Sequence, residues 1–313
     1  MDEHGRPPHA LTPRTSLTAS QGYWKNATVS TTLSEACRDL LSAVLAEAGF
    51  NRASEESGLD QGTRCTKCLI DLGIGCGDQT IYLMCKKPIR PSDEPWWDRR
   101  EHCVKFDHYV GITKDKTQAR YASERLAELR LDGNEKPEVA LFCADAAKPT
   151  TWNEQLTATI RHSQAKSQES WVLALDSAYH FAPSRWQLIE YSHRHLAASF
   201  MAFDLCISPT ATFHQKLMLR ILTTLTRAPW CNFMTPMEYR ARLVQAGYQA
   251  DRISITDVSE NIFTPLAEFL DRQDKRLSVL GLGIGSLRIA KHMFAWWGRT
   301  GVVRGVIVVA RQS

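Results

Sequence analysis

Two kinds of hydrophobic pattern alternate along the chain. Short apolar runs, which are typical of buried strands, cover residues 68–72, 109–113, 139–146, 171–175, 200–207, 250–258 and 305–311. Apolar residues recur every three or four positions, a spacing that predicts helices, in 33–48, 116–126, 213–225, 236–248, 259–280 and 286–297. Strands that alternate with helices indicate an α/β protein with a mostly parallel sheet and helices on both faces.

Three segments fall outside this alternation. Residues 1–20 are rich in Pro, Thr, Ser and charge, and we expect a flexible tail there. Residues 86–107 contain three prolines and are longer than an ordinary connection, which indicates a surface insertion. Residues 208–235 form a second insertion after the fifth strand. We therefore expect one domain, residues 21–313, preceded by a tail.

Composition and charge exclude several classes of protein. The 313 residues are 43% hydrophobic and 23% charged, with a formal net charge of +4, as in an ordinary soluble protein. Without a basic cluster we expect no nucleic-acid partner, and without about 18 consecutive apolar residues no integral membrane protein. The odd number of cysteines, nine, indicates a reducing, cytoplasmic location. The Cys65–Cys68 pair lacks the further ligands that zinc needs, so we expect no metal.

The clearest candidate for chemistry is the stretch of residues 69–80, where a strand pattern turns into a helix start. It contains in order Asp71, Gly73, Gly75, Gly77, Asp78 and Gln79. Glycine lacks Cβ, so this backbone can take positive φ and a ligand can lie directly against it. The following helix start offers unpaired N–H groups to an anionic group. The order D-x-G-x-G-x-G-D-Q differs from the dinucleotide fingerprint G-x-G-x-x-G.

This loop resembles motif I of the class I S-adenosylmethionine (SAM) methyltransferases. The resemblance covers roughly residues 21–313 and implies a Rossmann-like, seven-stranded sheet whose last strand runs antiparallel. It also implies that SAM is the cofactor and S-adenosylhomocysteine (SAH) the product, with the SAM carboxylate near the three glycines and Asp71 orienting the loop. The further cofactor contacts that the family implies are Tyr23, Thr113, Gln118, Asp145, Ala146 and Asp176.

Some of these positions have structural alternatives. Many family members end the second strand in an acid that binds the ribose, whereas this chain has Thr113. Asp145 follows the third strand, where an isolated Asp is usually a turn residue or a helix cap. Tyr23 and Trp24 resemble a segment that closes over the cofactor, but they can equally form a hydrophobic staple for the next helix.

The candidate catalytic residues, Asp176, Tyr179 and His180, follow the fourth strand. The segment resembles the E-S-x-x-H exit of tocopherol-type and sugar or indole methyltransferases, in which the histidine lies near the acceptor. A neutral imidazole there can take a proton from a phenol, an amine or an acidic carbon, and the alternative is a structural hydrogen bond. Cyclopropane-forming relatives carry Glu before this His. Tyr179 stands here instead, which favours transfer to a heteroatom.

The predicted acceptor is a lipophilic or aromatic small molecule with a reactive nitrogen or oxygen. This expectation rests on aromatic and apolar residues of the predicted pocket roof, Trp24, Tyr179, Phe213, Trp230, Phe233 and Met234. We expect a monomeric or homodimeric enzyme of specialised metabolism. SAM-assisted cyclisation and a non-catalytic binding or regulatory role remain alternatives. We interpret Gly281–Gly285 as a flexible joint and 286–297 as core or pocket wall, with peripheral membrane contact as the alternative.

Overall fold

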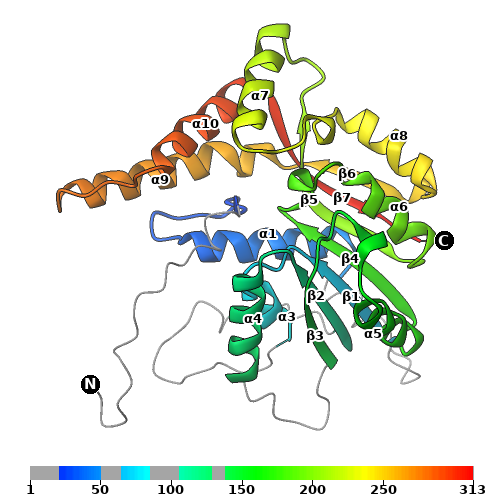
Figure 1. The fold of residues 1–313 in the computed structure, drawn as a ribbon. Coiled ribbons are helices and arrows are strands. Elements are labelled where there is room, and N and C mark those ends of the chain that lie inside the picture. Colours follow the sequence, from blue (N-terminus) through cyan, green and yellow to red (C-terminus); the bar gives the residue numbers. More distant parts are fainter. Residues whose placement is uncertain (1–20, 51–64, 85–105, 129–137, 313) are drawn as a thin grey trace, which may run out of the picture.

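The computed structural model describes residues 21–50, 65–84, 106–128 and 138–312. The predicted tail at 1–20 and nearly all of the predicted insertion at 86–107 lie outside these ranges. Figure 1 shows a twisted sheet with helices packed on both faces and a pair of long helices that projects beyond one side.

The sheet has seven strands in the order β3-β2-β1-β4-β5-β7-β6. The strands are β1 (Lys67–Leu72), β2 (His108–Thr113), β3 (Glu138–Cys143), β4 (Glu169–Leu175), β5 (Ser199–Ile207), β6 (Ile253–Asp257) and β7 (Val303–Ala310). The first five run parallel, and β7 runs antiparallel to both β5 and β6. The predicted mostly parallel sheet with an antiparallel last strand is confirmed.

Helices cover both faces of this sheet. They are α1 (Leu33–Glu47), α3 (Asp78–Met84), α4 (Lys116–Glu128), α5 (Glu154–Ala165), α6 (Trp186–Arg194), α7 (Phe213–Leu225), α8 (Pro236–Ala246), α9 (Phe263–Ser278) and α10 (Leu287–Thr300). One core holds buried side chains of α1, α3, α9 and α10, and a second holds those of α5, α6 and α8. Successive residues of β5, such as Ala202 and Phe203, belong to opposite cores, because successive side chains of a strand point to opposite faces of the sheet.

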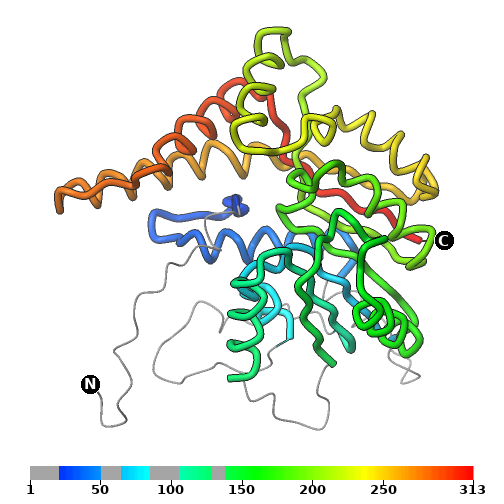
Figure 2. Tube along the Cα trace, in the orientation of Figure 1, coloured from blue at the N-terminus to red at the C-terminus, as the bar shows by residue number. Residues whose placement is uncertain are grey.

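The first helix, α1, packs against strands from the C-terminal half of the chain. α1 begins at a capping box, in which the Thr32 side chain accepts from the Glu35 N–H at 3.2 Å and the Glu35 carboxylate accepts from the Thr32 N–H at 2.7 Å. Leu40, Leu41 and Val44 are buried on its inner face. α1 contacts β5 and β7, so an early helix lies beside the last strand (Figure 2).

A few element boundaries differ from the sequence prediction because turns replace the ends of regular elements. The last helix pair begins later than expected: Ser259–Asn261 forms a 3₁₀ turn, because the Asp257 carboxylate accepts a hydrogen bond from the Ser259 N–H at 2.9 Å. Similarly, Ala250–Arg252 is a 3₁₀ turn ahead of β6, and β3 ends at Cys143.

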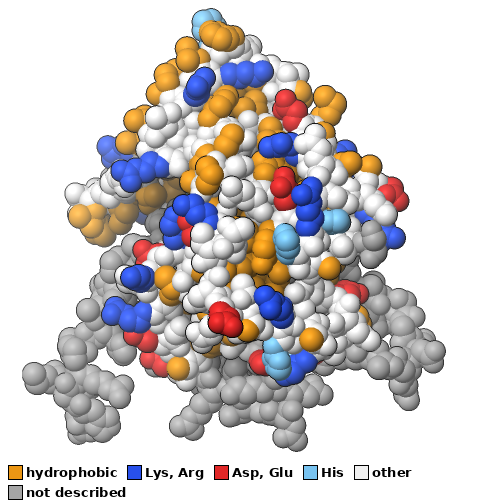
Figure 3. Space-filling view, turned by 45° about the vertical axis from the view of Figure 1, so that its right-hand side comes forward, with side chains coloured by type: hydrophobic (Ala, Val, Ile, Leu, Met, Phe, Trp, Pro, Cys, Tyr) orange, Lys and Arg blue, Asp and Glu red, His pale blue; other side chains and the backbone are white. Residues whose placement is uncertain are grey.

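α7 is apolar on two sides. Leu219 and Thr223 are buried on its inner side. Its outer side presents Phe213, Leu217, Met218, Ile221 and Leu225, which are between 47% and 76% exposed. Figure 3 shows hydrophobic side chains gathered over this helix at the top of the molecule. Phe213 was predicted to lie in the pocket roof. In the structure it is the most exposed of these residues, at 76%, and lies on the outer side of α7.

Candidate functional site

A cavity of about 420 Å³ lies at the carboxyl ends of β1, β2, β3 and β4. Parallel strands bring the loops that follow them to one edge of a sheet, which is where ligands bind in open α/β folds. Among the predicted cofactor residues, the structure brings nine together in its lining: Gly73, Gly75, Asp78, Gln79, Thr113, Gln118, Asp145, Ala146 and Asp176. We call it the glycine-loop cavity.

The loop after β1 adopts the conformation that its glycines permit. Gly73, Gly75 and Gly77 have φ values of 81°, 56° and 84°, a region that disfavours other residues. A Cβ on Gly73 would lie 2.8 Å from the Ser177 Cβ, so this glycine lets the loops after β1 and β4 approach each other. A Cβ on Gly77 would lie 3.0 Å from the Ala122 Cβ, so Gly77 faces α4 and is not in the cavity lining.

Asp71 acts from behind the cavity wall. It is fully buried, and its carboxylate accepts hydrogen bonds from the Gln79 amide at 2.5 and 2.6 Å and from the Tyr109 hydroxyl at 2.6 Å. Burial raises the pKa of Asp71 to about 6, although the hydrogen bonds from Tyr109 and Gln79 oppose that rise. Because Gln79 lines the cavity and Asp71 does not, Asp71 positions Gln79.

The remaining predicted cofactor residues have partners within the protein. The Thr113 hydroxyl donates to the Gln118 side-chain oxygen at 2.9 Å. Asp145 forms an ion pair with Lys114 at 2.9 Å.

Asp78 forms an ion pair with Arg125 at 2.9 Å. Tyr23 is half-buried outside both cavity linings, and its backbone N–H donates to the Ala36 carbonyl at 2.7 Å. Its predicted contact with the cofactor stays a prediction, as do the roles of Asp71 and Gly77.

The loop after β4, residues 176–186, carries the three candidate catalytic residues and is called the β4 exit loop below. Asp176 has a φ of 53° and is 6% exposed. Its carboxylate accepts from the Gln21 backbone N–H at 2.6 Å and from the Tyr179 hydroxyl at 2.8 Å. Burial, with Asp176 nearby, raises the pKa of Tyr179 well above its usual value, so this phenol stays protonated.

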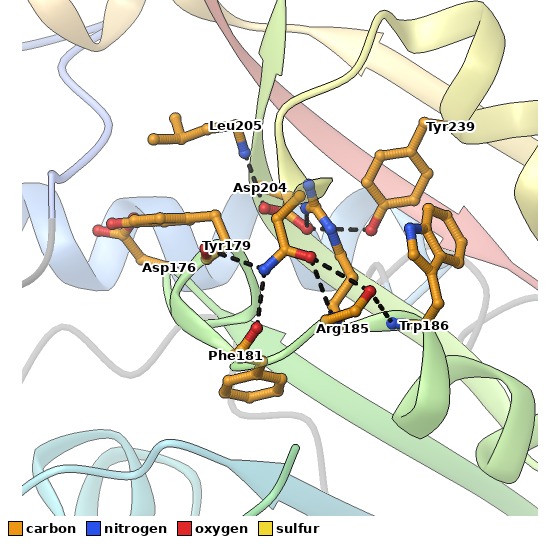
Figure 4. Close-up of polar contacts among 10 residues, drawn as sticks. Asp176, Tyr179, Phe181, Arg185, Trp186, Asp204, Leu205 and Tyr239 are labelled. Atoms are coloured by element: carbon orange, nitrogen blue, oxygen red, sulfur yellow. Dashed lines mark hydrogen bonds and ion pairs between the residues drawn. The ribbon is translucent and has the colours of Figure 1, made fainter. Parts of the chain in front are cut away.

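A buried polar network anchors the β4 exit loop to β5 and to the start of α8 (Figure 4). Arg185, fully buried, pairs with the Asp204 carboxylate, which also accepts from the Tyr239 hydroxyl at 3.0 Å. The Asn232 side chain accepts from the Arg185 N–H at 3.0 Å and donates to the Phe181 carbonyl at 2.8 Å. The Asn232 side chain also donates to the Tyr179 carbonyl at 3.2 Å, so it holds the backbone on both sides of His180.

The sequence analysis missed this network, although one signal was available. Asp204 lies within a strand of nine residues that are all buried, and a carboxylate there requires a buried partner. The sequence does not show that this partner is Arg185, which lies in the exit loop of the neighbouring strand β4.

A second cavity, of about 260 Å³, adjoins the β4 exit loop. Its lining is mostly aliphatic and aromatic and comes from α7, α9, α10 and the loops beside them. The lining residues are Gln21, Leu33, Tyr179, His180, Leu205, Leu219, Leu222, Thr223, Thr226, Ala228, Phe233, Leu266, Leu270, Leu287, Ala290, Met293, Phe294 and Trp297. We call it the apolar cavity.

Among the described residues, His180 is the one that lines both cavities. His180 is exposed, with these hollows beside it, and the partial desolvation of its imidazole by the surrounding protein lowers its pKa from 6.5. The imidazole is therefore neutral at neutral pH, and it stands where the two cavities approach each other.

The predicted roof is partly in place. Tyr179 and Phe233 line the apolar cavity, whereas Trp24 is buried against Phe269 with ring centroids 5.0 Å apart. Much of the wall is instead formed by α9 and α10. The interpretation of residues 286–297 as core or pocket wall is confirmed, because Met293, Phe294 and Trp297 line the cavity.

The part of the chain that the structure describes contains neither a metal-binding cluster nor a membrane-spanning helix. No group of His, Cys, Asp and Glu side chains in this part of the chain is arranged to hold a metal ion. No helix within the same residues is both long and apolar enough to cross a membrane.

Comparison with known proteins identifies the fold. No family model matches the chain, and no curated protein is similar to it in sequence. A mycolic acid cyclopropane synthase, solved with SAH, is similar at a TM-score of 0.59 and 11% identity, covering 95% of this chain and 93% of its own. Geranyl diphosphate C-methyltransferase from Streptomyces coelicolor is similar at a TM-score of 0.52 and 16% identity, covering 94% and 91%.

A third solved structure broadens the comparison. A (4+2)-cyclase is similar at a TM-score of 0.51 and 16% identity, with 94% of this chain and 86% of the cyclase covered. At these identities the similarity establishes the fold, which is that of the class I SAM-dependent methyltransferases and of related enzymes.

Proposed function

We propose that this protein is a SAM-dependent methyltransferase that methylates a nitrogen or oxygen of a lipophilic small molecule. The observation that carries the proposal is the position of His180, in the lining of both the glycine-loop cavity and the apolar cavity. A methyl donor in the first cavity and an apolar acceptor in the second would meet beside this side chain. The fold supports the proposal, since the similar proteins include a methyltransferase and a SAH-bound synthase.

The residues of the glycine-loop cavity fit SAM. Its volume of about 420 Å³ is in the usual range for a small-molecule site. The φ values of Gly73 and Gly75 leave the backbone open to close approach by a ligand, and Asp145 and Gln118 offer hydrogen-bonding groups at the far side. When bound, SAM supplies an electrophilic methyl group on a sulfonium.

The chain's own residues would then position the acceptor and receive its proton. Neutral His180 has an unprotonated ring nitrogen, and its lowered pKa keeps it ready to accept a proton at neutral pH. Tyr179 and Asp176 hydrogen-bond to each other, so in our proposal they position groups at the site and His180 serves as the base. The apolar walls exclude water, and most of the rate would come from proximity and orientation.

The setting of the reaction is a further part of the proposal. The described cysteines are free thiols, which supports a reducing, cytoplasmic location, and the lipophilic cavity supports an acceptor from specialised metabolism. Assisted cyclisation is the alternative, since a cyclase shares the fold. Product mass separates the two, because methylation adds one methylene per transfer whereas cyclisation yields an isomer.

The first experiment measures SAM and SAH binding by calorimetry. We expect micromolar dissociation constants for the wild type and a loss of at least tenfold in Gly75→Val, whose side chain would occupy the cavity. Gly285→Val is the matched control, because Gly285 has nearly the same φ, 58° against 56°, and a Cβ there meets nothing within 4 Å.

Equal weakening in both variants would show that backbone strain, and not the cavity, is responsible. No SAM or SAH binding by the folded wild type would overturn the proposed function.

A further inference from the structure

α7 separates the apolar cavity from the surface of the molecule. On its inner side, Leu219, Leu222 and Thr223 line that cavity. On its outer side, exposed apolar residues recur every four positions, so they form one stripe along the helix, at 213, 217, 221 and 225. We call this stripe, with Met218 beside it, the α7 outer face. A continuous exposed apolar face of this kind marks an interaction surface.

α7 also carries positive charge and no negative charge. Lys216, Arg220 and Arg227 are exposed on this helix or directly after it, and the sequence has no Asp or Glu from residue 205 to residue 237. Within the described ranges, none of these three cations forms an ion pair with a carboxylate. The pKa of the next acid, Glu238, is lowered mainly by hydrogen bonds from Thr235 and only secondarily by Lys216. The helix therefore presents unneutralised cations beside its apolar stripe.

A second exposed apolar segment lacks such charge. The tip of the α9–α10 hairpin exposes Val279 and Leu280, but residues 277–287 contain no charged side chain. Two cations that flank the tip, Lys275 and Arg288, pair with aspartates of α9. Val279 and Leu280 also line neither cavity. Apolar exposure, free positive charge and a place beside the acceptor cavity thus coincide at α7 and not at this tip.

The chemistry of the α7 outer face fits the surface of a membrane that contains anionic lipids. An amphipathic helix with basic residues beside its apolar face lies in the plane of the headgroups, with its apolar side chains at the acyl boundary and its cations near anionic headgroups. A second copy of the chain fits less well. Two copies docked through the same face would bring the three cations of one against the same three of the other.

We propose that the α7 outer face docks on the surface of a membrane containing anionic lipids. The apolar cavity then lies one helix, about 10 Å, from the bilayer. A lipophilic acceptor dissolved in the bilayer therefore has a short path to the cavity. The docking stands on the chemistry of α7 alone, whereas the conclusion that the methyl acceptor is dissolved in the membrane rests on the proposed function.

Co-sedimentation of the full chain with vesicles tests the docking. The vesicles are phosphatidylcholine with about 30% phosphatidylserine, or phosphatidylcholine alone. We expect the wild type to bind the anionic vesicles at least about tenfold more tightly, because each cation near such a surface strengthens binding by about fivefold. Combining Lys216→Gln, Arg220→Gln and Arg227→Gln should reduce this preference to less than about threefold.

A pair of apolar substitutions tests the stripe itself. Phe213→Ser with Leu225→Ser removes side chains that are 76% and 74% exposed, and it should weaken binding to anionic vesicles at least about tenfold. Val279→Ser with Leu280→Ser is the matched control, because these side chains of the hairpin tip are 84% and 74% exposed. The control should change binding by less than about threefold. Urea unfolding checks that every variant keeps the stability of the wild type.

Three results with these proteins would overturn the inference. The first is equal binding of the wild type to both kinds of vesicle, and the second is wild-type binding by the Phe213 and Leu225 variant or an equal loss in the hairpin-tip control. The third is a wild type that binds neither kind of vesicle, which would favour an acidic protein as the occupant. Neither SAM nor an acceptor is present in this measurement, so its outcome is independent of the SAM-binding test of the proposed function.

Discussion

At the scale of single residues, we propose that His180, which lines both cavities, acts mainly on the acceptor and contributes little to holding the cofactor. We predict that His180→Ala lowers kcat by about 10²- to 10⁴-fold, the usual contribution of a general base, and changes the SAM dissociation constant less than about twofold. In the wild type, kcat should fall as pH decreases below 6.5, because protonation removes the base. Desolvation lowers the pKa of His180, so the midpoint of that fall should lie below 6.5.

The assay follows label transfer from SAM to the acceptor across about pH 5 to 9. His180→Ala should lack the acidic limb of the profile. An unchanged kcat, or an acidic limb that persists in the variant, would exclude this role.

Asp71 makes a prediction about stability. Burial raises its pKa to about 6 in the folded state from an ordinary 3.8. Between these values the folded state binds more protons than the unfolded state, so this group's contribution to stability is complete below about pH 3.8 and is lost as pH rises through about 6. As pH rises through that interval, the unfolding free energy of the wild type should therefore fall relative to that of Asp71→Asn.

Urea unfolding of both proteins at about pH 4, 5, 6 and 7 measures this difference. The variant keeps every other titrating group, so the contributions of those groups cancel in the comparison. A difference that is constant with pH would mean that the pKa of Asp71 is the same in both states. SAM affinity measured in parallel should fall in the variant, because the position of Gln79 depends on both Asp71 oxygens.

At the scale of elements, the β4 exit loop depends on the Arg185–Asp204 pair, which is fully buried. Arg185→Met should cost about 3–5 kcal/mol of unfolding free energy, because it leaves the Asp204 carboxylate buried without its cation. The double variant Arg185→Met with Asp204→Leu should recover much of that loss. Urea unfolding of the single and the double variant measures the coupling between the two residues. A double variant that is less stable than Arg185→Met would contradict the prediction.

The elements themselves could be predicted largely from the sequence. Periodicity is a local property, and it located the strands and most helices to within a few residues. The loop after β1 was recognisable because three glycines repeat at every second position. The partners of Gln21, Asp176 and Arg185 could not be predicted in the same way. Gln21 and Asp176 lie 155 residues apart and meet only through the tertiary fold.

At the scale of the whole molecule, the order of elements predicted the layered, mostly parallel sheet, and the family resemblance of the glycine loop implied its antiparallel last strand. The sequence left open whether α10 would face the core or a pocket, and it did not predict that α9 would line the apolar cavity, because apolar residues on a helix look alike in the sequence whether they face a core or a hollow. Which predicted cofactor residues reach the glycine-loop cavity also depended on packing, as Asp71 and Gly77 illustrate.

The single residue shared by the two cavity linings has an evolutionary consequence. One cavity is built at the strand ends by backbone and small polar groups, and the other by helices added outside the sheet. Mutations in α7, α9 or α10 can therefore change which molecule is accepted while leaving the residues of the glycine-loop cavity untouched. On the proposed function, a lineage with this architecture can acquire new acceptors through substitutions in these helices alone.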